Sequence, residues 1–175
     1  MNTPENIILC GFMGTGKTTV GRIVAAMLGW RFWDTDAQIE AQLGRPISQI
    51  FAEDGEAYFR RWESAICQEL ARRRHEVIGA GGGIVLNPAN REALSRAGLV
   101  ICLDAPADEI AARLAGMTDR PLLAGPDPAK RIAELLAARA EAYGALSHHI
   151  DTAGCSPEEV AEAILALWGR HDGPA

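Results

Sequence analysis

Short apolar runs alternate with longer segments of helical periodicity along most of this chain. Runs rich in Val, Ile and Leu predict β-strands at residues 7–10, 31–33, 77–80, 99–103 and 149–150. Apolar positions at helical spacing predict helices at residues 17–28, 37–43, 47–52, 56–73, 89–97, 107–114, 129–143 and 157–168. Because strands and helices alternate, we expect an α/β fold with a doubly wound, five-stranded parallel sheet covered by helices on both faces.

Three of the predicted helices begin with a capping residue that is followed by proline. These starts are Asn87-Pro88, Asp127-Pro128 and Ser156-Pro157. Glu159 completes a capping box at the last of them. No internal repeat or low-complexity tract interrupts the pattern, so we expect a single domain over residues 1–175 with a frayed tail at residues 169–175.

Composition and charge exclude several classes of function. Hydrophobic residues make up 48% of the 175, but no apolar run approaches the length of a membrane span. A net charge of −6 argues against a broad nucleic-acid surface. The four cysteines lie far apart without a C-x-x-C pair, which argues against a zinc site or disulfide framework and is typical of a reducing cytosol. The start of the chain lacks the basic and apolar stretches of a secretory signal. We therefore expect a cytoplasmic protein without a membrane or nucleic-acid partner, and we expect a monomer.

A glycine-rich loop follows the first predicted strand and leads into a helix. Residues 11–18, GFMGTGKT, satisfy the pattern G-x-x-x-x-G-K-S/T, whose backbone N–H groups cradle phosphate oxygens. In this pattern Lys17 reaches the β- and γ-phosphates, and Thr18 offers its hydroxyl to Mg²⁺. The alternative is an ordinary glycine-rich turn, but the strand before it and the helix after it favour nucleotide binding. The predicted ATP contacts in the loop are Gly14, Thr15, Gly16, Lys17, Thr18 and Thr19.

Two aspartates stand at the end of the second predicted strand. Ligands of open parallel sheets lie outside the carboxyl ends of the strands, so Asp34 and Asp36 are expected to face the cleft. Asp34 is the stronger candidate for the metal, and Asp36 is expected one pleat further on, where it can hydrogen-bond acceptor hydroxyls. Either residue could instead be a turn or cap aspartate. Asp104, after the fourth strand, is a weaker metal candidate.

The arginines on the predicted helices have a plain interpretation as surface charges. Arg60 lies four residues after Glu56 and three before Glu63, which by itself indicates a solvated ion-pair ladder. Arg139 stands in an alanine-rich helix and by itself also passes as a surface residue. Residues 115–127, punctuated by glycine and proline, suit either a connector or a lid that closes over bound phosphate.

An ordered set of short motifs changes the interpretation of these arginines. The strings are GFMGTGKTTVGR at 11–22, DTD at 34–36, FRRWE at 59–63, GGG at 81–83, DRPLL at 119–123 and ARAEAY at 138–143. In this order and spacing they resemble shikimate kinases, P-loop kinases that transfer a phosphoryl group from ATP to shikimate. The resemblance covers roughly residues 6–168 and implies the P-loop kinase fold with a mobile lid.

The resemblance implies a role for each matching residue on the acceptor side. Asp36 would bind two ring hydroxyls of shikimate and accept a proton from the attacked 3-hydroxyl. Arg60 and Arg139 would clasp the carboxylate of shikimate, and the backbone of Gly81, Gly82 and Gly83 would line the acceptor site.

On the nucleotide side the resemblance implies that Asp34 contacts Mg²⁺ through water and that Arg113 lies against adenine. Arg120 would lie in the lid and touch the phosphates when the lid closes, so that Lys17, Asp36 and Arg120 form the catalytic set. The chain departs from the family pattern modestly, with Trp62 in the FRRWE string and no arginine in the loop at 152–156.

The implied activity is ATP-dependent phosphorylation of the 3-hydroxyl of shikimate to shikimate 3-phosphate, in the shikimate pathway of aromatic amino-acid biosynthesis, with Mg²⁺ as cofactor. Two enzyme alternatives share the loop and the lid: a gluconate-type sugar-acid kinase and a nucleoside monophosphate kinase. A third alternative is a nucleotide-binding regulatory module without activity, which would be expected to have lost Asp36 or Arg120.

Overall fold

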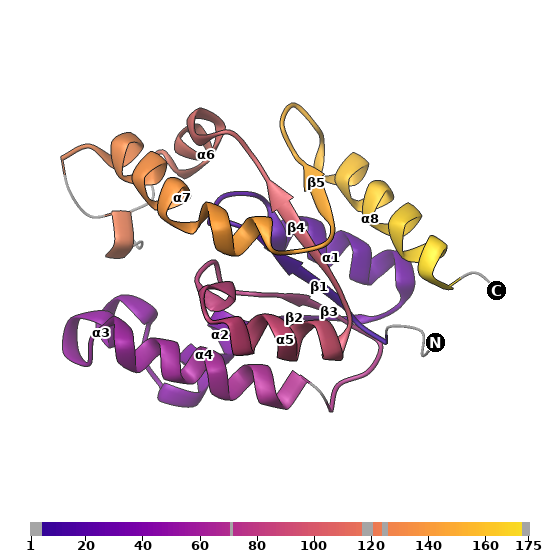
Figure 1. Ribbon diagram of the computed structural model, residues 1–175, viewed down its shortest axis with the longest axis horizontal. Coiled ribbons are helices and arrows are strands. Elements are labelled where there is room, and N and C mark those ends of the chain that lie inside the picture. The colour runs from indigo at the N-terminus through magenta and orange to yellow at the C-terminus, as the bar shows by residue number, and fades with distance from the viewer. Residues whose placement is uncertain (1–4, 71, 117–120, 124–125, 173–175) are drawn as a thin grey trace.

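The centre of the molecule is a sheet of five parallel strands (Figure 1). This computed structural model describes residues 5–70, 72–116, 121–123 and 126–172. The strands are β1 (Ile7–Cys10), β2 (Arg31–Asp34), β3 (Glu76–Gly79), β4 (Leu99–Asp104) and β5 (His149–Asp151), in the spatial order β2-β3-β1-β4-β5. The predicted α/β fold with a five-stranded parallel sheet is therefore confirmed.

Helices cover both faces of this sheet. They are α1 (Lys17–Leu28), α2 (Thr35–Leu43), α3 (Ile47–Glu53), α4 (Glu56–Leu70), α5 (Pro88–Ala97), α6 (Ala107–Leu114), α7 (Pro128–Gly144) and α8 (Pro157–Asp172), with short 3₁₀ turns at Ile84–Leu86 and Pro121–Leu123. Among the described residues, no helix combines the length and apolar character that crossing a bilayer requires.

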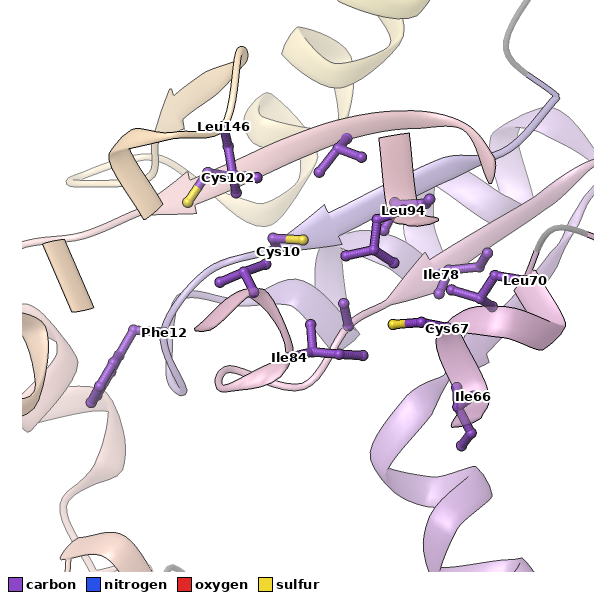
Figure 2. Packing of buried hydrophobic residues seen from close by; sticks show 14 of the residues in the cluster. Cys10, Phe12, Ile66, Cys67, Leu70, Ile78, Ile84, Leu94, Cys102 and Leu146 are labelled. Carbon is purple, nitrogen blue, oxygen red and sulfur yellow. The ribbon is translucent and has the colours of Figure 1, made fainter. Parts of the chain in front are cut away.

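Alternate residues of strands β1, β3 and β4 enter different hydrophobic clusters. Ile7 and Leu9 of β1 pack with α1 and α8, whereas Ile8 and Cys10 of the same strand pack with α4, α5 and α7. Figure 2 shows the second cluster, in which Cys10 and Ile78 of the sheet lie near side chains of α4 and α5. Side chains of a strand point alternately to its two faces, so a sheet buried on both faces needs apolar residues at nearly every position.

The last helix is longer than the sequence pattern predicts. The pattern predicts a helix that ends at residue 168, whereas α8 continues to Asp172. Trp168 is 7% exposed and packs edge-on against Trp30 with ring centroids 5.3 Å apart. This contact anchors the helix near its end, so a further turn forms beyond it.

The start of α2 also differs from the prediction. The helix begins at Thr35, so Asp36 lies in its first turn and not one pleat further along β2. Asp34 is the N-cap residue, and its Oδ1 accepts hydrogen bonds from the backbone N–H groups of Asp36 and Ala37 at 3.0 and 3.2 Å. The cap turns the chain from strand to helix immediately, which is the physical reason for the different position of Asp36.

Candidate active site

The glycine-rich loop connects β1 to α1, as its motif predicts. Gly11 has a φ of 132°, and a Cβ there would collide with the backbone oxygen of Leu103 on the neighbouring strand. Only glycine fits such a position, because a side chain would be strained by the backbone angle and blocked by the neighbour. The helix that follows directs the N–H groups of its first turn toward the loop, which suits an anion.

Lys17 folds back over this loop. Its Nζ donates hydrogen bonds to the carbonyl oxygens of Gly11 and Phe12, at 2.9 and 2.8 Å. Burial lowers the pKa of Lys17 from its usual value, and the carboxylates of Asp36 and Asp34 oppose that shift. The loop thus holds its one amino group where phosphate oxygens are expected, with two carboxylates nearby.

Thr18 and Asp34 bring hard oxygen atoms together at the mouth of the loop. The Thr18 hydroxyl donates to Asp34 Oδ2 at 3.2 Å, while the other carboxylate oxygen of Asp34 caps α2. A hydroxyl and a carboxylate beside a phosphate loop are the ligand types that Mg²⁺ uses, directly or through its water shell. The donor set therefore fits Mg²⁺.

Asp104, the weaker metal candidate, is engaged elsewhere. Its Oδ2 lies 2.7 Å from Nδ1 of His149, and its Oδ1 accepts from Sγ of Cys102 at 3.3 Å. The other ring nitrogen of His149 lies 3.0 Å from the carbonyl oxygen of Leu146. Cys102, Asp104 and His149 are the described group whose donor atoms could chelate a cation. Each of these atoms already has a neighbour, and the contacts tie β4 to the edge strand β5.

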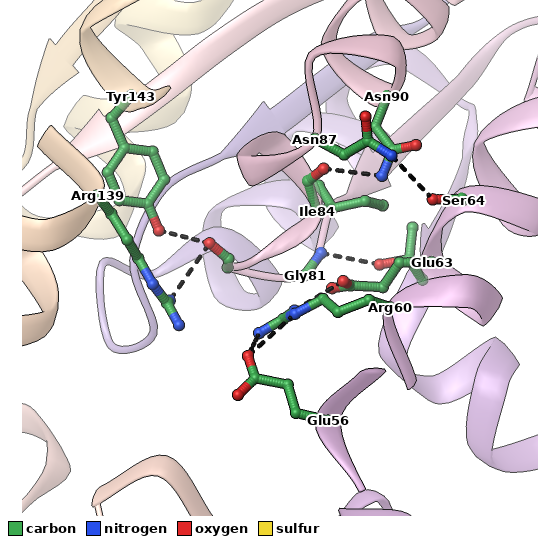
Figure 3. Close-up of polar contacts among 12 residues, drawn as sticks. Glu56, Arg60, Glu63, Ser64, Gly81, Ile84, Asn87, Asn90, Arg139 and Tyr143 are labelled. Carbon is green, nitrogen blue, oxygen red and sulfur yellow. Dashed lines mark hydrogen bonds and ion pairs between the residues drawn. The ribbon is translucent and has the colours of Figure 1, made fainter. Parts of the chain in front are cut away.

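Arg60 makes the ion pairs with Glu56 and Glu63 that its sequence spacing predicts, but one of the two pairs is not exposed to solvent as expected. Its guanidinium lies 2.6 Å from Glu56 Oε1 and 2.6 Å from Glu63 Oε2 (Figure 3). Glu63 is only 1% exposed, so this part of the expected solvated ladder is buried. A buried carboxylate that holds a guanidinium fixes its direction far better than an exposed partner does.

Arg139 is buried, contrary to the plain interpretation of its sequence. It is 4% exposed, and its guanidinium lies 5.5 Å from the centroid of the Phe12 ring. Its Nη1 lies 3.5 Å from the carbonyl oxygen of Gly82. Arg139 on α7 and Arg60 on α4 thus approach the same glycine segment from different helices, as Figure 3 shows. Arg61, beside Arg60, is exposed as expected.

The three glycines at 81–83 each lie against a different part of the site. A Cβ on Gly81 would overlap Asp36 Oδ1, and a Cβ on Gly83 would overlap the guanidinium of Arg60. A Cβ on Gly82 would stand 3.4 Å from the oxygen of Gly11 and 3.5 Å from the nitrogen of Met13 in the loop. The absence of side chains lets the segment pass between the phosphate loop and the charged residues.

We expect Gly83→Ala to weaken acceptor binding selectively. The added methyl group would displace the guanidinium of Arg60, so KM for the acceptor should rise by about tenfold or more, with KM for ATP nearly unchanged. Steady-state kinetics with each substrate varied in turn measures this. Gly144→Ala is the matched control, because a Cβ there meets nothing within 4 Å. Equal changes in both KM values would contradict the expectation.

The pKa of the Glu63 carboxyl group lies above the usual range. Burial raises its pKa to about 7; Arg60 opposes the shift, the Asp36 carboxylate adds to it, and Arg139 opposes it more weakly. Among the residues that the structure describes, its Oε1 has no hydrogen-bond partner. The folded protein therefore holds a proton at pH values where the unfolded chain has lost it.

The raised pKa of Glu63 predicts that the free energy of unfolding depends on pH. Between the unfolded pKa of about 4.5 and the folded pKa of about 7, the contribution of Glu63 to the free energy of unfolding should fall as pH rises, by on the order of 2 kcal/mol. Urea unfolding at pH 5 and pH 7.5 measures the difference. Glu63→Gln, which cannot titrate, should reduce that difference. An identical pH dependence in both proteins would show that Glu63 titrates normally.

One cleft joins the two halves of the site. It has a volume of about 660 Å³, and it is lined by the loop and α1, by Asp34 and Asp36, by Arg60 and Glu63, by residues 79–83, and by Arg113, Leu122 and Arg139. Thus the predicted site residues that the structure describes line it, except Thr15, whose side chain is buried within the loop, and the weaker metal candidate Asp104, which contacts His149. Arg120 and Asp119 lie outside the described residues, so the lid stays a prediction.

Arg113 bridges the loop and the segment after β5. It donates hydrogen bonds to the oxygen of Gly14 at 3.3 Å and to the hydroxyl and backbone oxygens of Thr152, each at 3.1 Å. Its Nη2 also forms an ion pair with Oε2 of Glu109, on the same helix, at 2.9 Å. These contacts place a guanidinium in the lining of the cleft, beside the phosphate loop.

Sequence reasoning missed two contributions to this site. Helical spacing presents Glu63 as a surface partner of Arg60, and the string at 138–143 contains Tyr143 without indicating a role for it. The signal for Tyr143 was its position four residues after Arg139, which puts both on one face of a helix. No comparable signal marks Glu63 as buried.

Comparison with known proteins assigns this arrangement to a family. A family model described as shikimate kinase matches residues 13–168. The chain belongs to the shikimate kinase family. Among curated members, a shikimate kinase of Caldanaerobacter subterraneus subsp. tengcongensis is 45% identical over 169 residues, which cover 97% of this chain and 99% of the relative. Another shikimate kinase, from Symbiobacterium thermophilum, is 48% identical over 163 residues and covers 91% and 94%.

Solved structures agree with this membership of the shikimate kinase family. The shikimate kinase from Acinetobacter baumannii in complex with shikimate has a TM-score of 0.90 and 37% identity, and the match covers 94% of this chain and 93% of that one. A gluconokinase from Sinorhizobium meliloti matches with a TM-score of 0.62 at 22% identity, which shows a shared fold alone. The resemblance stated from the sequence is therefore confirmed.

Proposed function

We propose that this chain transfers the γ-phosphoryl group of ATP to the 3-hydroxyl of shikimate and produces shikimate 3-phosphate, a step of the shikimate pathway of aromatic amino-acid biosynthesis. The observation that carries the proposal is the single cleft that joins a phosphate loop to an aspartate and two buried or half-buried arginines. Membership of the shikimate kinase family supports the choice of acceptor. We also propose that the protein is a monomer and lies in the cytoplasm. Light scattering during size-exclusion chromatography tests the oligomeric state.

The nucleotide half of the cleft supplies positive charge and alignment, which are what phosphoryl transfer chiefly requires. When ATP binds, the ammonium group of Lys17 exchanges the loop carbonyls for β- and γ-phosphate oxygens. Thr18 and Asp34 would hold Mg²⁺, which when bound neutralises phosphate charge. Arg113 would lie against adenine, and Arg120 would reach the phosphates from the lid.

The acceptor half would bind shikimate through complementary groups. The planar guanidinium groups of Arg60 and Arg139 match a carboxylate, and the backbone at residues 81–83 lines the same side of the cleft. Asp36 would receive the proton of the 3-hydroxyl while the bond from that oxygen to phosphorus forms and the bond to ADP breaks. Closure of the lid would exclude water, which would otherwise hydrolyse ATP.

A coupled assay of ADP release against three acceptors tests the proposal. Turnover with shikimate, and little with gluconate or nucleoside monophosphates, is the expected result. Preferential turnover with either other acceptor would assign the chain to one of the enzyme alternatives. ATP binding without turnover on any acceptor would support the regulatory module.

The metal role of Asp34 has its own expected result. Asp34→Asn should lower activity at ordinary Mg²⁺ and regain part of it when Mg²⁺ is raised or replaced by Mn²⁺, since the variant weakens a link to the ion's water shell. Activity titrations with each metal measure the rescue. If neither metal restores activity, Asp34 does not act on the magnesium, and the contacts of Asp104 would need re-examination.

A further inference from the structure

Tyr143 and Arg139 meet at one carbonyl group of the glycine segment. They stand four residues apart on α7 and are 7% and 4% exposed. The Tyr143 hydroxyl donates to the oxygen of Gly82 at 2.6 Å, while Nη1 of Arg139 lies 3.5 Å from the same oxygen (Figure 3). One short and one long contact converge on a single acceptor.

The contact lengths show which donor satisfies this carbonyl. A neutral phenol hydroxyl at 2.6 Å makes a complete hydrogen bond, whereas a distance of 3.5 Å is at the outer limit for a guanidinium. Burial raises the pKa of Tyr143 to about 12, although the charge of Arg139 and a hydrogen bond with its side chain oppose the shift, so the hydroxyl stays protonated and continues to donate. A buried carbonyl without this donor would attract the nearest charged N–H group, which belongs to Arg139.

The backbone on both sides of Gly82 is held as well. The N–H of Gly81 donates to the hydroxyl oxygen of Thr35 at 2.8 Å, and the carbonyl oxygen of Gly83 accepts from the N–H of Leu86 at 3.0 Å. These hydrogen bonds limit the movement of the Gly82 carbonyl between them. Because the carbonyl cannot easily move toward Arg139, the guanidinium is the group that would turn if the tyrosine hydroxyl were lost.

We propose that Tyr143 is a positioning residue for the acceptor. Its short hydrogen bond to the Gly82 carbonyl weakens the attraction of that oxygen for the Arg139 guanidinium, which stays directed into the cleft, available to a carboxylate. The inference rests on the proposed function, because it assumes that the acceptor is a carboxylate-bearing polyol. Tyr143 itself touches no reacting atom.

Tyr143→Phe removes the hydroxyl and keeps the ring. We expect KM for shikimate to rise by about tenfold, with kcat and KM for ATP within about twofold of wild type. Tyr58→Phe is the control, since Tyr58 is the chain's other tyrosine and lies on α4 with its ring against Trp62. An unchanged KM for shikimate, or an equal rise in both KM values, would overturn the proposal.

A double-mutant cycle separates positioning from general packing. If Tyr143 acts through Arg139, Tyr143→Phe should add little to the KM of an Arg139→Ala variant, whereas additive effects would contradict the proposal. Incorporation of 4-aminophenylalanine at position 143 restores a donor and should restore KM even if the phenylalanine variant folds poorly. Failure of this rescue, with the protein folded, would also overturn it. Wild-type turnover in the same assay tests the proposed function independently.

Discussion

Lys17→Ala is expected to lower kcat by at least about 10²-fold while the protein remains folded. The loss follows from the removal of the only lysine in the loop, whose charge acts on the β- and γ-phosphates where negative charge shifts during transfer. Folding should survive, because the Phe12 carbonyl that Lys17 contacts also accepts a hydrogen bond from Thr15 Oγ1 at 2.8 Å. Single-turnover kinetics at saturating ATP, with circular dichroism for the fold, measures both parts.

Lys130→Ala provides the matched control for that experiment. Lys130 is the chain's other lysine and is exposed in the first turn of α7. Its replacement should leave kcat within about twofold of wild type, as is usual for an exposed residue without a special contact. Turnover of Lys17→Ala within about tenfold of wild type would remove the loop lysine from the mechanism.

Asp36→Asn is expected to reduce kcat by about 10²-fold or more and to raise KM for shikimate. The amide has nearly the shape of the carboxylate but cannot take the proton of the attacked hydroxyl, and it loses charge beside Lys17. Unlike Asp34→Asn, the variant should not respond to added Mg²⁺ or Mn²⁺. Asp108→Asn, at an exposed position in the first turn of α6, controls for the loss of one carboxylate.

The pH dependence of the Asp36→Asn variant distinguishes a proton acceptor from a positioning group. A general base contributes a titration to the rate, so the acidic limb of the kcat profile should disappear in the variant. If the variant keeps the wild-type profile and loses only affinity for shikimate, then Asp36 orients the hydroxyl without accepting its proton.

Periodicity predicted the elements because buried runs such as β1 and β4, and buried positions at helical spacing such as those of α4, can be recognised locally. The pattern predicts each of the five strands and eight α-helices found in the described part of the chain, and the sheet is parallel as the alternation requires. The motif spacing also identified the loop, since a strand, a glycine turn and a helix start can be recognised locally. The predicted ends of elements were less accurate: α8 continues to Asp172, beyond residue 168, where Trp168 packs on Trp30 from a distant part of the chain.

The environment of the charged residues could not be predicted in the same way. Arg60, Glu63 and Arg139 all have the spacing of a solvated helix face, and only the packing of separate helices around the glycine segment buries two of them. Burial of a charge depends on what lies opposite in space, and a local pattern carries no information on that. The ordered motifs predicted the role of the arginines through resemblance and not through their own chemistry.

The two carboxylate oxygens of Asp34 have different structural roles. Oδ1 accepts the hydrogen bonds of the first turn of α2, the helix that carries Asp36, while Oδ2 accepts from Thr18 at the proposed metal position. A substitution of Asp34 that alters metal binding therefore also changes the N-cap of α2. The stability of the fold and the catalytic rate cannot be optimised independently at this residue. In a mutational scan, asparagine keeps the capping oxygen and should be tolerated for expression but not for activity, whereas alanine should be depleted on both counts.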